Sequence, residues 1–262
     1  MQASRVTVFA VLGLGEAGGR FAVDLVRAGA TVHGYDPRVP APQGVRPSRD
    51  EADACRDADV VLSVNSAADA LTALVNGVPG CRSGALWAEL NTASPGLKEK
   101  VAAAAGDRVD VVDVAIMAPV PGTGLRTPLA VSGPAAERFA SAVRAFGAGV
   151  EVVPGPVGAA ATRKLLRSVF YKGMAAAVVE ALTAARAAGL EEWLRENIRS
   201  ELIRSDAATL DRLVDGSRTH ARRRTHEMAA AAELLDELGI PARVARASHD
   251  WLVDLDDGPT PG

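Results

Sequence analysis

Short apolar runs rich in β-branched residues alternate with Ala- and Leu-rich stretches over the first 155 residues of the chain. The apolar runs predict strands at residues 5–12, 31–35, 59–64, 84–90, 108–115, 128–132 and 150–153. Their nearly continuous apolar character is typical of strands that are covered on both faces. Ser48 and Glu51 predict a capping box that opens the helix before the third strand. Strands and helices that alternate in this way predict an α/β fold with a doubly wound parallel sheet.

The pattern changes at Pro154, Gly155 and Pro156, after which no strand is predicted. Residues 158–188 form one Ala-rich helical stretch, and Gly189 marks its end as a left-handed cap. At about 1.5 Å per residue such a helix spans roughly 45 Å, enough to link two domains. Further helices are predicted at residues 191–204, 207–213, 219–238 and 241–255. We therefore expect a sheet-containing domain over residues 1–155, a long linking helix, and an all-α C-terminal domain within residues 156–262.

Composition narrows the class of protein. The 262 residues carry 29 basic and 32 acidic side chains, a formal net charge of -3, and 48% of the residues are hydrophobic. This globular composition lacks the basic, aromatic-rich surface that binds single-stranded nucleic acid, so we expect no nucleic-acid partner. Cys55 and Cys81 are too few for a disulfide framework, and the four histidines are too dispersed to predict a metal site. So few cysteines fit a reducing interior, and we expect a cytoplasmic protein. No uncharged apolar run approaches the roughly 18 residues of a membrane helix, so we expect no membrane partner.

A glycine-rich turn directly follows the first predicted strand and opens a helix. It consists of Gly13, Leu14, Gly15, Glu16, Ala17 and Gly18. Glycines at this spacing permit a tight turn and approach of the backbone to a pyrophosphate, while the helix N-terminus supplies N–H groups and a partial positive charge. Asp36 closes the second strand 23 residues after Gly13, where a carboxylate holds the adenosine ribose hydroxyls. The turn and Asp36 together predict a dinucleotide-binding domain of the Rossmann type.

Asp36 favours NAD as the cofactor, because its charge repels the 2′-phosphate of NADP. Arg38 lies two residues further on and is able to accept that phosphate, so NADP stays open as the alternative. Asn65 ends the third strand and is expected at the carboxyl edge of the sheet, where it either contacts the cofactor or forms an ordinary turn.

Lysine is rare in this chain. It occurs only as Lys98, Lys100, Lys164 and Lys172, so 25 of the 29 basic residues are arginines. A GC-rich coding bias accounts for the many arginines. A lysine that is kept despite this bias is therefore a candidate for a specific function. Lys164, Ser168 and Lys172 are spaced by four residues and therefore share one face of the long predicted helix.

Three segments resemble the β-hydroxyacid dehydrogenase family, which includes 3-hydroxyisobutyrate and 6-phosphogluconate dehydrogenases. Residues 89–95, Glu-Leu-Asn-Thr-Ala-Ser-Pro, lie where that family has an acidic, Ser-Thr, Pro motif beside the nicotinamide. Residues 113–125 are similar to its substrate-binding loop, and residues 158–164 to the helix start that carries its catalytic lysine. The resemblance covers nearly the whole chain, and the C-terminal half looks most like a less characterised 6-phosphogluconate dehydrogenase-like branch.

The resemblance implies an NAD(P)-dependent oxidoreductase that interconverts an alcohol and a carbonyl on a small substrate, such as a 3-hydroxy acid. It implies Lys164 as the general acid/base, with Ser168 beside it in the catalytic group. It places Asn91, Thr92, Met117, Ala118, Pro119, Lys172 and His226 at the substrate, and Thr92 also at the cofactor. It further implies a homodimer that forms through the helical domain.

The chain also departs from the family pattern. Met117, Ala118 and Pro119 replace a Ser-Gly-Gly triplet that binds a substrate carboxylate, and they offer no hydroxyl for it. Ser168 replaces an Asn and His226 a late Lys, and each also fits an ordinary exposed helix surface. Two alternatives stay open: an imine or enamine reductase of the same fold, which usually has another residue in place of Lys164, and a dinucleotide-binding protein without catalytic activity.

Overall fold

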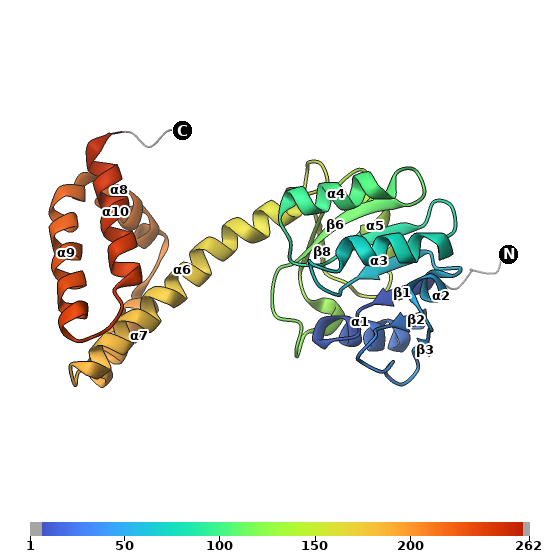
Figure 1. Cartoon of the computed structure of the whole chain (residues 1–262), viewed down its shortest axis with the longest axis horizontal. Helices are drawn as coiled ribbons and strands as arrows, with labels where there is room; N and C mark the ends of the chain where they lie inside the picture. Colours follow the sequence, from blue (N-terminus) through green and yellow to red (C-terminus); the bar gives the residue numbers. More distant parts are fainter. Residues whose placement is uncertain (1–6, 259–262) are drawn as a thin grey trace. The chain divides into compact units, whose positions relative to one another are not determined.

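The structure is a computed structural model that describes residues 7–258. Within these residues an eight-stranded sheet forms the centre of the N-terminal region (Figure 1). Its strands are β1 (Val8–Leu12), β2 (Thr31–Tyr35), β3 (Arg46–Pro47), β4 (Val60–Ser63), β5 (Leu86–Glu89), β6 (Asp110–Ile116), β7 (Leu129–Ser132) and β8 (Val150–Val152). Their order is β3-β2-β1-β4-β5-β6-β7-β8, so the chain winds outward from β1 in both directions. The doubly wound α/β fold predicted from the sequence is confirmed.

The last two strands run against the other six. β6 and β7 pair antiparallel, with Asp113 opposite Ser132, whereas the pairs on either side of them are parallel. Parallel neighbours need a crossover connection, usually a helix, but residues 117–128 contain only the short turn η2 (Gly124–Arg126). The chain therefore returns beside β6 in the opposite direction, and the sheet is mostly rather than entirely parallel.

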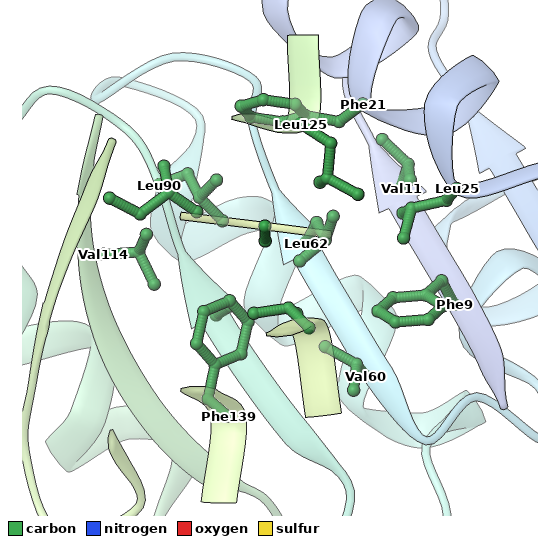
Figure 2. Packing of buried hydrophobic residues seen from close by; sticks show 14 of the residues in the cluster. Phe9, Val11, Phe21, Leu25, Val60, Leu62, Leu90, Val114, Leu125 and Phe139 are labelled. Carbon is green, nitrogen blue, oxygen red and sulfur yellow. The ribbon is translucent and has the colours of Figure 1, made fainter. Parts of the chain in front are cut away.

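Five helices cover the two faces of this sheet. They are α1 (Glu16–Arg27), α2 (Glu51–Cys55), α3 (Ala70–Gly77), α4 (Pro95–Ala105) and α5 (Ala136–Arg144). Because side chains alternate along a strand, Phe9 and Val11 of β1 pack on one face with Phe21 of α1 and Phe139 of α5 (Figure 2). The alternate residues of the strands pack on the other face with α2, α3 and α4, around the fully buried ring of Trp87. Two covered faces explain why most of the strands are largely apolar.

The cap of α2 differs from the predicted one. Asp50 is the N-cap residue, and its Oδ1 accepts a hydrogen bond of 2.7 Å from the backbone N–H of Asp53. The capping box predicted from Ser48 and Glu51 is therefore wrong, because a carboxylate lies two residues nearer to the start of the helix.

The remaining helices follow the sheet, and the residues from 156 to 258 contain no strand. They are α6 (Ala159–Ala187), α7 (Glu191–Arg204), α8 (Ala207–Thr219), α9 (Ala221–Glu237) and α10 (Arg243–Asp257). One further short turn, η1 (Val78–Gly80), lies earlier in the chain, between α3 and β5. The chain divides into two compact units, Met1–Arg167 and Ser168–Gly262, so the division lies inside α6 and not at residue 155. Among the helices of residues 7–258, none combines the length and the apolar character that a membrane span requires.

The second unit has a small core of its own. Ala184 of α6, Ala232 and Leu235 of α9, and Ala245 of α10 are buried together. The carboxylate of Glu180 accepts hydrogen bonds from the backbone N–H groups of Val244 and Ala245, each at 2.8 Å. A side chain of α6 thereby caps the N-terminus of α10, which no side chain of its own N-cap residue does.

Candidate functional site

The glycine turn between β1 and α1 has the geometry of a phosphate-binding loop. Gly13 has a φ of +97°, and a Cβ atom there would lie 2.5 Å from the carbonyl oxygen of Val64. A Cβ atom on Gly18 would lie 1.9 Å from the carbonyl oxygen of Gly13. Gly15 differs, because a Cβ atom there would meet nothing within 4 Å. The first and last glycines are thus required by the fold, while Gly15 leaves open space before the N-terminus of α1, where an anion is stabilised.

Asp36 holds this turn in place at the end of β2. Its Oδ2 accepts a hydrogen bond of 2.8 Å from the backbone N–H of Leu14, and its Oδ1 accepts bonds from the N–H groups of Arg38 and Val39 at 2.8 and 3.0 Å. Partial burial raises the pKa of Asp36, but the three N–H groups outweigh it and hold the pKa below its usual range. Asp36, predicted as a ribose ligand, therefore also fastens the glycine turn.

A cavity of about 610 Å³ opens beside the glycine turn. It is lined by Leu12, Gly13, Gly15, Tyr35, Asp36, Pro37, Arg38, Val39, Glu51, Val64, Asn65, Asp69, Thr72 and Ala73. These residues follow the carboxyl ends of β1, β2 and β4, at the point where the winding of the sheet reverses, and dinucleotides bind at such points in open α/β sheets. The open space at Gly15 and the adjoining cavity fit a dinucleotide. The predicted residues Gly13, Gly15, Asp36, Arg38 and Asn65 line it together.

Asn91 connects this cavity to the next strand. Its side chain donates a hydrogen bond of 2.6 Å to Oδ1 of Asn65 and a longer one of 3.4 Å to Oγ of Ser63. The backbone N–H of Asn91 donates to Oε1 of Glu89 at 3.1 Å. Asn91 is buried, so it ties the ends of β4 and β5 together. Its predicted contact with substrate stays a prediction.

Lys164 and Thr92 meet, although 72 residues separate them in the chain. Nζ of Lys164, in the second turn of α6, donates a hydrogen bond of 2.8 Å to Oγ1 of Thr92, which follows β5. Both residues line a small pocket together with Asn91. Thr92 is exposed and Lys164 is half-buried, so a polar group presented from solvent has access to this pair.

Two further side chains hold the start of α6. Oδ2 of Asp113, on β6, accepts hydrogen bonds from the backbone N–H groups of Gly158 and Ala161 at 3.1 and 2.9 Å. Oγ of Ser132, on β7, accepts one from the N–H of Ala160 at 3.0 Å. Neither residue was singled out from the sequence. In the sequence, the signal for this role was that Asp113 and Ser132 are polar residues within largely apolar predicted strands.

The other predicted substrate residues divide between the two units. Met117 lies just after β6, where its N–H donates to the carbonyl oxygen of Pro128 at 2.9 Å and its partly buried side chain packs against the small cluster of Ala115, Ala130, Val153 and Ala160. Ala118 follows it in the same loop, and the carbonyl oxygen of Pro119 accepts a hydrogen bond from Thr123 Oγ1 at 3.0 Å. In the second unit lie Ser168 and Lys172 of α6 and His226 of α9. Their roles at the substrate stay predictions.

Comparison with known proteins identifies the family of each part of the chain. Residues 8–151 match the family described as NAD binding domain of 6-phosphogluconate dehydrogenase. Residues 185–255 match a domain family of unknown function, DUF1932.

Solved structures resemble the chain over almost its whole length. A conserved hypothetical protein from Sinorhizobium meliloti 1021 is 31% identical, with a TM-score of 0.63, over 95% of this chain and 88% of that one. A conserved protein of unknown function, described as structurally similar to 3-hydroxyacid dehydrogenases, is 28% identical, with a TM-score of 0.62, over 95% and 97% of the two chains.

Imine reductases share the fold. The imine reductase from Myxococcus stipitatus in complex with NADP+ is 20% identical, with a TM-score of 0.80, over 95% of this chain and 93% of that one. A variant of the same enzyme in complex with NAD+ is 21% identical, with a TM-score of 0.78, over 95% and 92%. The resemblance stated from the sequence motifs is confirmed, and the chain belongs to the 6-phosphogluconate dehydrogenase-like family of NAD-binding proteins.

Proposed function

We propose that the protein is an NAD(P)-dependent oxidoreductase that transfers a hydride between a nicotinamide and a small hydroxy compound, with Lys164 as the general acid/base. The observation that carries the proposal is the hydrogen bond of 2.8 Å between Lys164 Nζ and Thr92 Oγ1. Thr92 adjoins Asn91, which in turn bonds to Asn65 on the rim of the dinucleotide cavity. An amine held near a dinucleotide cavity suits proton transfer to a carbonyl oxygen.

A bound nicotinamide supplies the hydride for reduction and accepts it in oxidation. In reduction, the ammonium group of Lys164 donates its proton to the carbonyl oxygen of the substrate. In oxidation, the neutral amine of Lys164 accepts the hydroxyl proton. Thr92 accepts one N–H of Lys164 and thereby orients the ammonium group.

Residues of the second unit extend the proposal. Ser168 and Lys172 follow Lys164 at four-residue intervals on α6 and therefore share a helix face with it. We assign Ser168 a hydrogen bond to the substrate and Lys172 the attraction of an anionic substrate group. The predicted role of His226, exposed on α9, stays a prediction.

The role of Lys164 is tested by Lys164→Ala. Loss of a general acid lowers kcat by about 10²–10⁴-fold, while the dissociation constant of the cofactor changes little. Lys100→Ala is the matched control, because Lys100 is an exposed lysine on α4. The substrates are first found by a cofactor-reduction screen of hydroxy acids, phosphorylated alcohols and amines with both NAD and NADP. Undiminished hydride transfer in Lys164→Ala at saturating cofactor would overturn the assignment.

We propose NAD as the preferred cofactor on electrostatic grounds. The dinucleotide cavity is lined by three carboxylates, Asp36, Glu51 and Asp69, and by one guanidinium, that of Arg38. A cavity with excess negative charge disfavours the 2′-phosphate of NADP. Titration of the protein with NADH and NADPH is expected to give the lower dissociation constant for NADH. Tighter binding of NADPH, lost in Arg38→Ala, would establish the opposite preference.

A second candidate is reduction of an imine or enamine on the same fold. It is favoured by the loop after β6, where the partly buried side chain of Met117 packs against a small cluster and offers no hydroxyl for a substrate carboxylate. The screen distinguishes the two, because an imine reductase run in reverse oxidises amines and not alcohols. Tight cofactor binding with turnover of neither class would support a dinucleotide-binding protein without catalytic activity.

A further inference from the structure

A group of charged side chains is buried beneath the pair formed by Lys164 and Thr92. Lys98 is 1% exposed, Glu89 1% and Asp113 0%. A fully buried lysine is rare in proteins unless it is paired, and this chain has only four lysines. Lys98 lines the same small pocket as Thr92 and Lys164. The burial of this lysine so near the proposed acid/base calls for a physical explanation.

Lys98 extends from α4 to the end of β5 and to the middle of β6. Its Nζ donates a hydrogen bond of 2.5 Å to the carbonyl oxygen of Glu89 and lies 3.3 Å from Oδ1 of Asp113. The other oxygen of Asp113 accepts the N–H groups of Gly158 and Ala161 at the start of α6. The Asp113 carboxylate thus faces an ammonium group on one side and a helix N-terminus on the other.

This arrangement makes the anchor of α6 depend on Lys98. A carboxylate at a helix N-terminus satisfies N–H groups that have no partner within the helix and interacts favourably with the helix dipole. A buried carboxylate without a compensating cation is strongly unfavourable, so removal of Lys98 displaces Asp113 or admits water to it. Either change weakens the hydrogen bonds that hold Gly158 and Ala161.

The anchor lies next to the proposed acid/base in the same helix. Ala161 and Lys164 are three residues apart, so their positions are coupled by the helical hydrogen bonds. Close packing fixes this end of α6 as well, because a Cβ atom on Gly158 would lie 3.2 Å from Cβ of Pro95 at the start of α4. A displacement of about 1 Å in a reacting group is enough to lower a rate by about 10²-fold.

We propose that Lys98 is a positioning residue, which acts through Asp113 to hold the first turn of α6 and so to keep the Lys164 amine at Thr92. The proposal rests on the proposed function in one respect only, namely that the position of Lys164 matters for turnover. The position itself is measurable without turnover. The alternative is that Lys98 merely fastens α4 to the sheet.

The central test is Lys98→Met, with Lys100→Met as the exposed control on the same helix. Hydrogen exchange at the amides of residues 158–161 is expected to be at least about tenfold faster in Lys98→Met. Labelling of Lys164 by an amine-reactive reagent, quantified by mass spectrometry against Lys172, is expected to rise. Once a substrate is known, kcat falls about tenfold or more while the KM for cofactor changes less than about twofold. Lys100→Met matches the wild type in every measurement.

Asp113→Asn tests the other half of the pair, since it keeps an oxygen acceptor but removes the negative charge. Adding Lys98→Met to Asp113→Asn is expected to change exchange at residues 158–161 less than Lys98→Met does alone, because no buried carboxylate is left without a cation. If Lys98→Met does not fold, Asp113→Asn itself must speed exchange at these amides.

Wild-type exchange and wild-type Lys164 labelling in folded Lys98→Met, despite a lower melting temperature, would reduce Lys98 to a structural role. If Lys98→Met is unfolded, wild-type exchange and wild-type Lys164 labelling in Asp113→Asn would likewise reduce Lys98 to a structural role. Failure of the proposed function looks different: Lys164→Ala would retain hydride transfer, while the exchange and labelling effects of Lys98→Met persisted.

Discussion

At the scale of single residues, two glycines of the same turn have different roles: the fold requires Gly13, and a bound ligand would require Gly15. Gly13 is held at positive φ against the backbone of Val64, whereas the space around Gly15 is empty. A methyl group at Gly13 must therefore distort the turn, and a methyl group at Gly15 intrudes only on whatever occupies the adjoining space. The two positions have different consequences for stability and binding.

Gly13→Ala is expected to lower the free energy of unfolding by about 3 kcal/mol, because Ala at this φ is strained and meets a carbonyl oxygen. Gly15→Ala is expected to leave stability within about 0.5 kcal/mol and to lower NADH affinity by about tenfold. Urea unfolding and fluorescence titration with NADH measure the two effects. A Gly15→Ala protein that binds NADH like the wild type would place the pyrophosphate elsewhere.

Asp36 gives stability a defined dependence on pH. Its pKa is lowered in the folded protein, so its contribution is fully present above the usual Asp value of about 3.9 and is lost as pH falls through the lower folded value. Asp36→Asn is expected to cost about 1 kcal/mol at pH 7, because a neutral acceptor replaces the carboxylate that binds three N–H groups.

The difference in unfolding free energy between wild type and Asp36→Asn should stay constant from pH 7 to about pH 5 and shrink below about pH 4. Urea unfolding at several pH values measures it, and Asp107→Asn, at an exposed turn, is the control. A difference that does not change with pH would mean that the Asp36 charge has no part in holding the glycine turn.

At the scale of elements, two helices in this chain receive their N-terminal caps from other elements. Asp113 of β6 caps α6, and Glu180 of α6 caps α10. Both caps join segments that are distant in sequence, by 48 and 65 residues. A helix start of this kind has no signature in its own sequence, because the residue before the helix does not supply the cap.

Glu180→Ala is expected to destabilise the second unit by about 1–2 kcal/mol through loss of the cap on α10. Glu233→Ala, at an exposed position on α9, is the matched control and should change stability by less than about 0.5 kcal/mol. Hydrogen exchange at Val244 and Ala245 locates the effect. Equal loss of unfolding free energy in both variants would show that the Glu180 cap contributes no more to stability than an exposed glutamate does.

Local patterns predicted most strands and helices of this fold, including α7 at residues 191–204. They did not predict β3, because Arg46 and Pro47 form a two-residue edge strand without an apolar pattern. The antiparallel direction of β7 was also not predictable from the sequence, because the hydrophobic pattern of a strand is the same whether its neighbour runs parallel or antiparallel to it. The glycine turn and Asp36 were recognisable because their chemistry lies within one βαβ segment.

The buried ion pair was not predictable in the same way. Lys98 looked like any lysine of an Ala-rich helix, and only the packing of α4 on the sheet brings it to Asp113. The family resemblance assigned Lys164 and Thr92 to one site, but it did not predict their hydrogen bond, which joins residues 72 positions apart. Sites built from several elements require the fold before their residues are seen together.

At the scale of the whole molecule, the second unit exposes many large apolar side chains. Trp193 is 64% exposed, Ile203 78% and Trp251 62%. An apolar groove of about 400 Å³ lies along α6 and α7, lined by Val178, Leu182, Arg195, Ile198, Arg199, Leu202 and Ile203. Extended apolar surfaces on a folded unit mark sites of association. We propose that a second copy of the chain covers them.

Light scattering after size-exclusion chromatography is expected to give twice the monomer mass of 27.0 kDa. Ile203→Asp should shift the protein to monomer, because a carboxylate in an apolar interface is costly to desolvate. Val75→Asp is the control, since Val75 is a similarly exposed apolar residue on α3 of the first unit. A monomer at micromolar concentration would exclude a stable dimer.

The cap of α6 also bears on how the protein folds during synthesis. Domains generally fold as units as they leave the ribosome, the N-terminal one first. A nascent chain that ends at Val152 has all the strands described here, yet Asp113 and Ser132 still await the N–H groups of Gly158, Ala160 and Ala161. The nucleotide-binding unit therefore becomes complete only when the first turn of α6 has emerged from the ribosome.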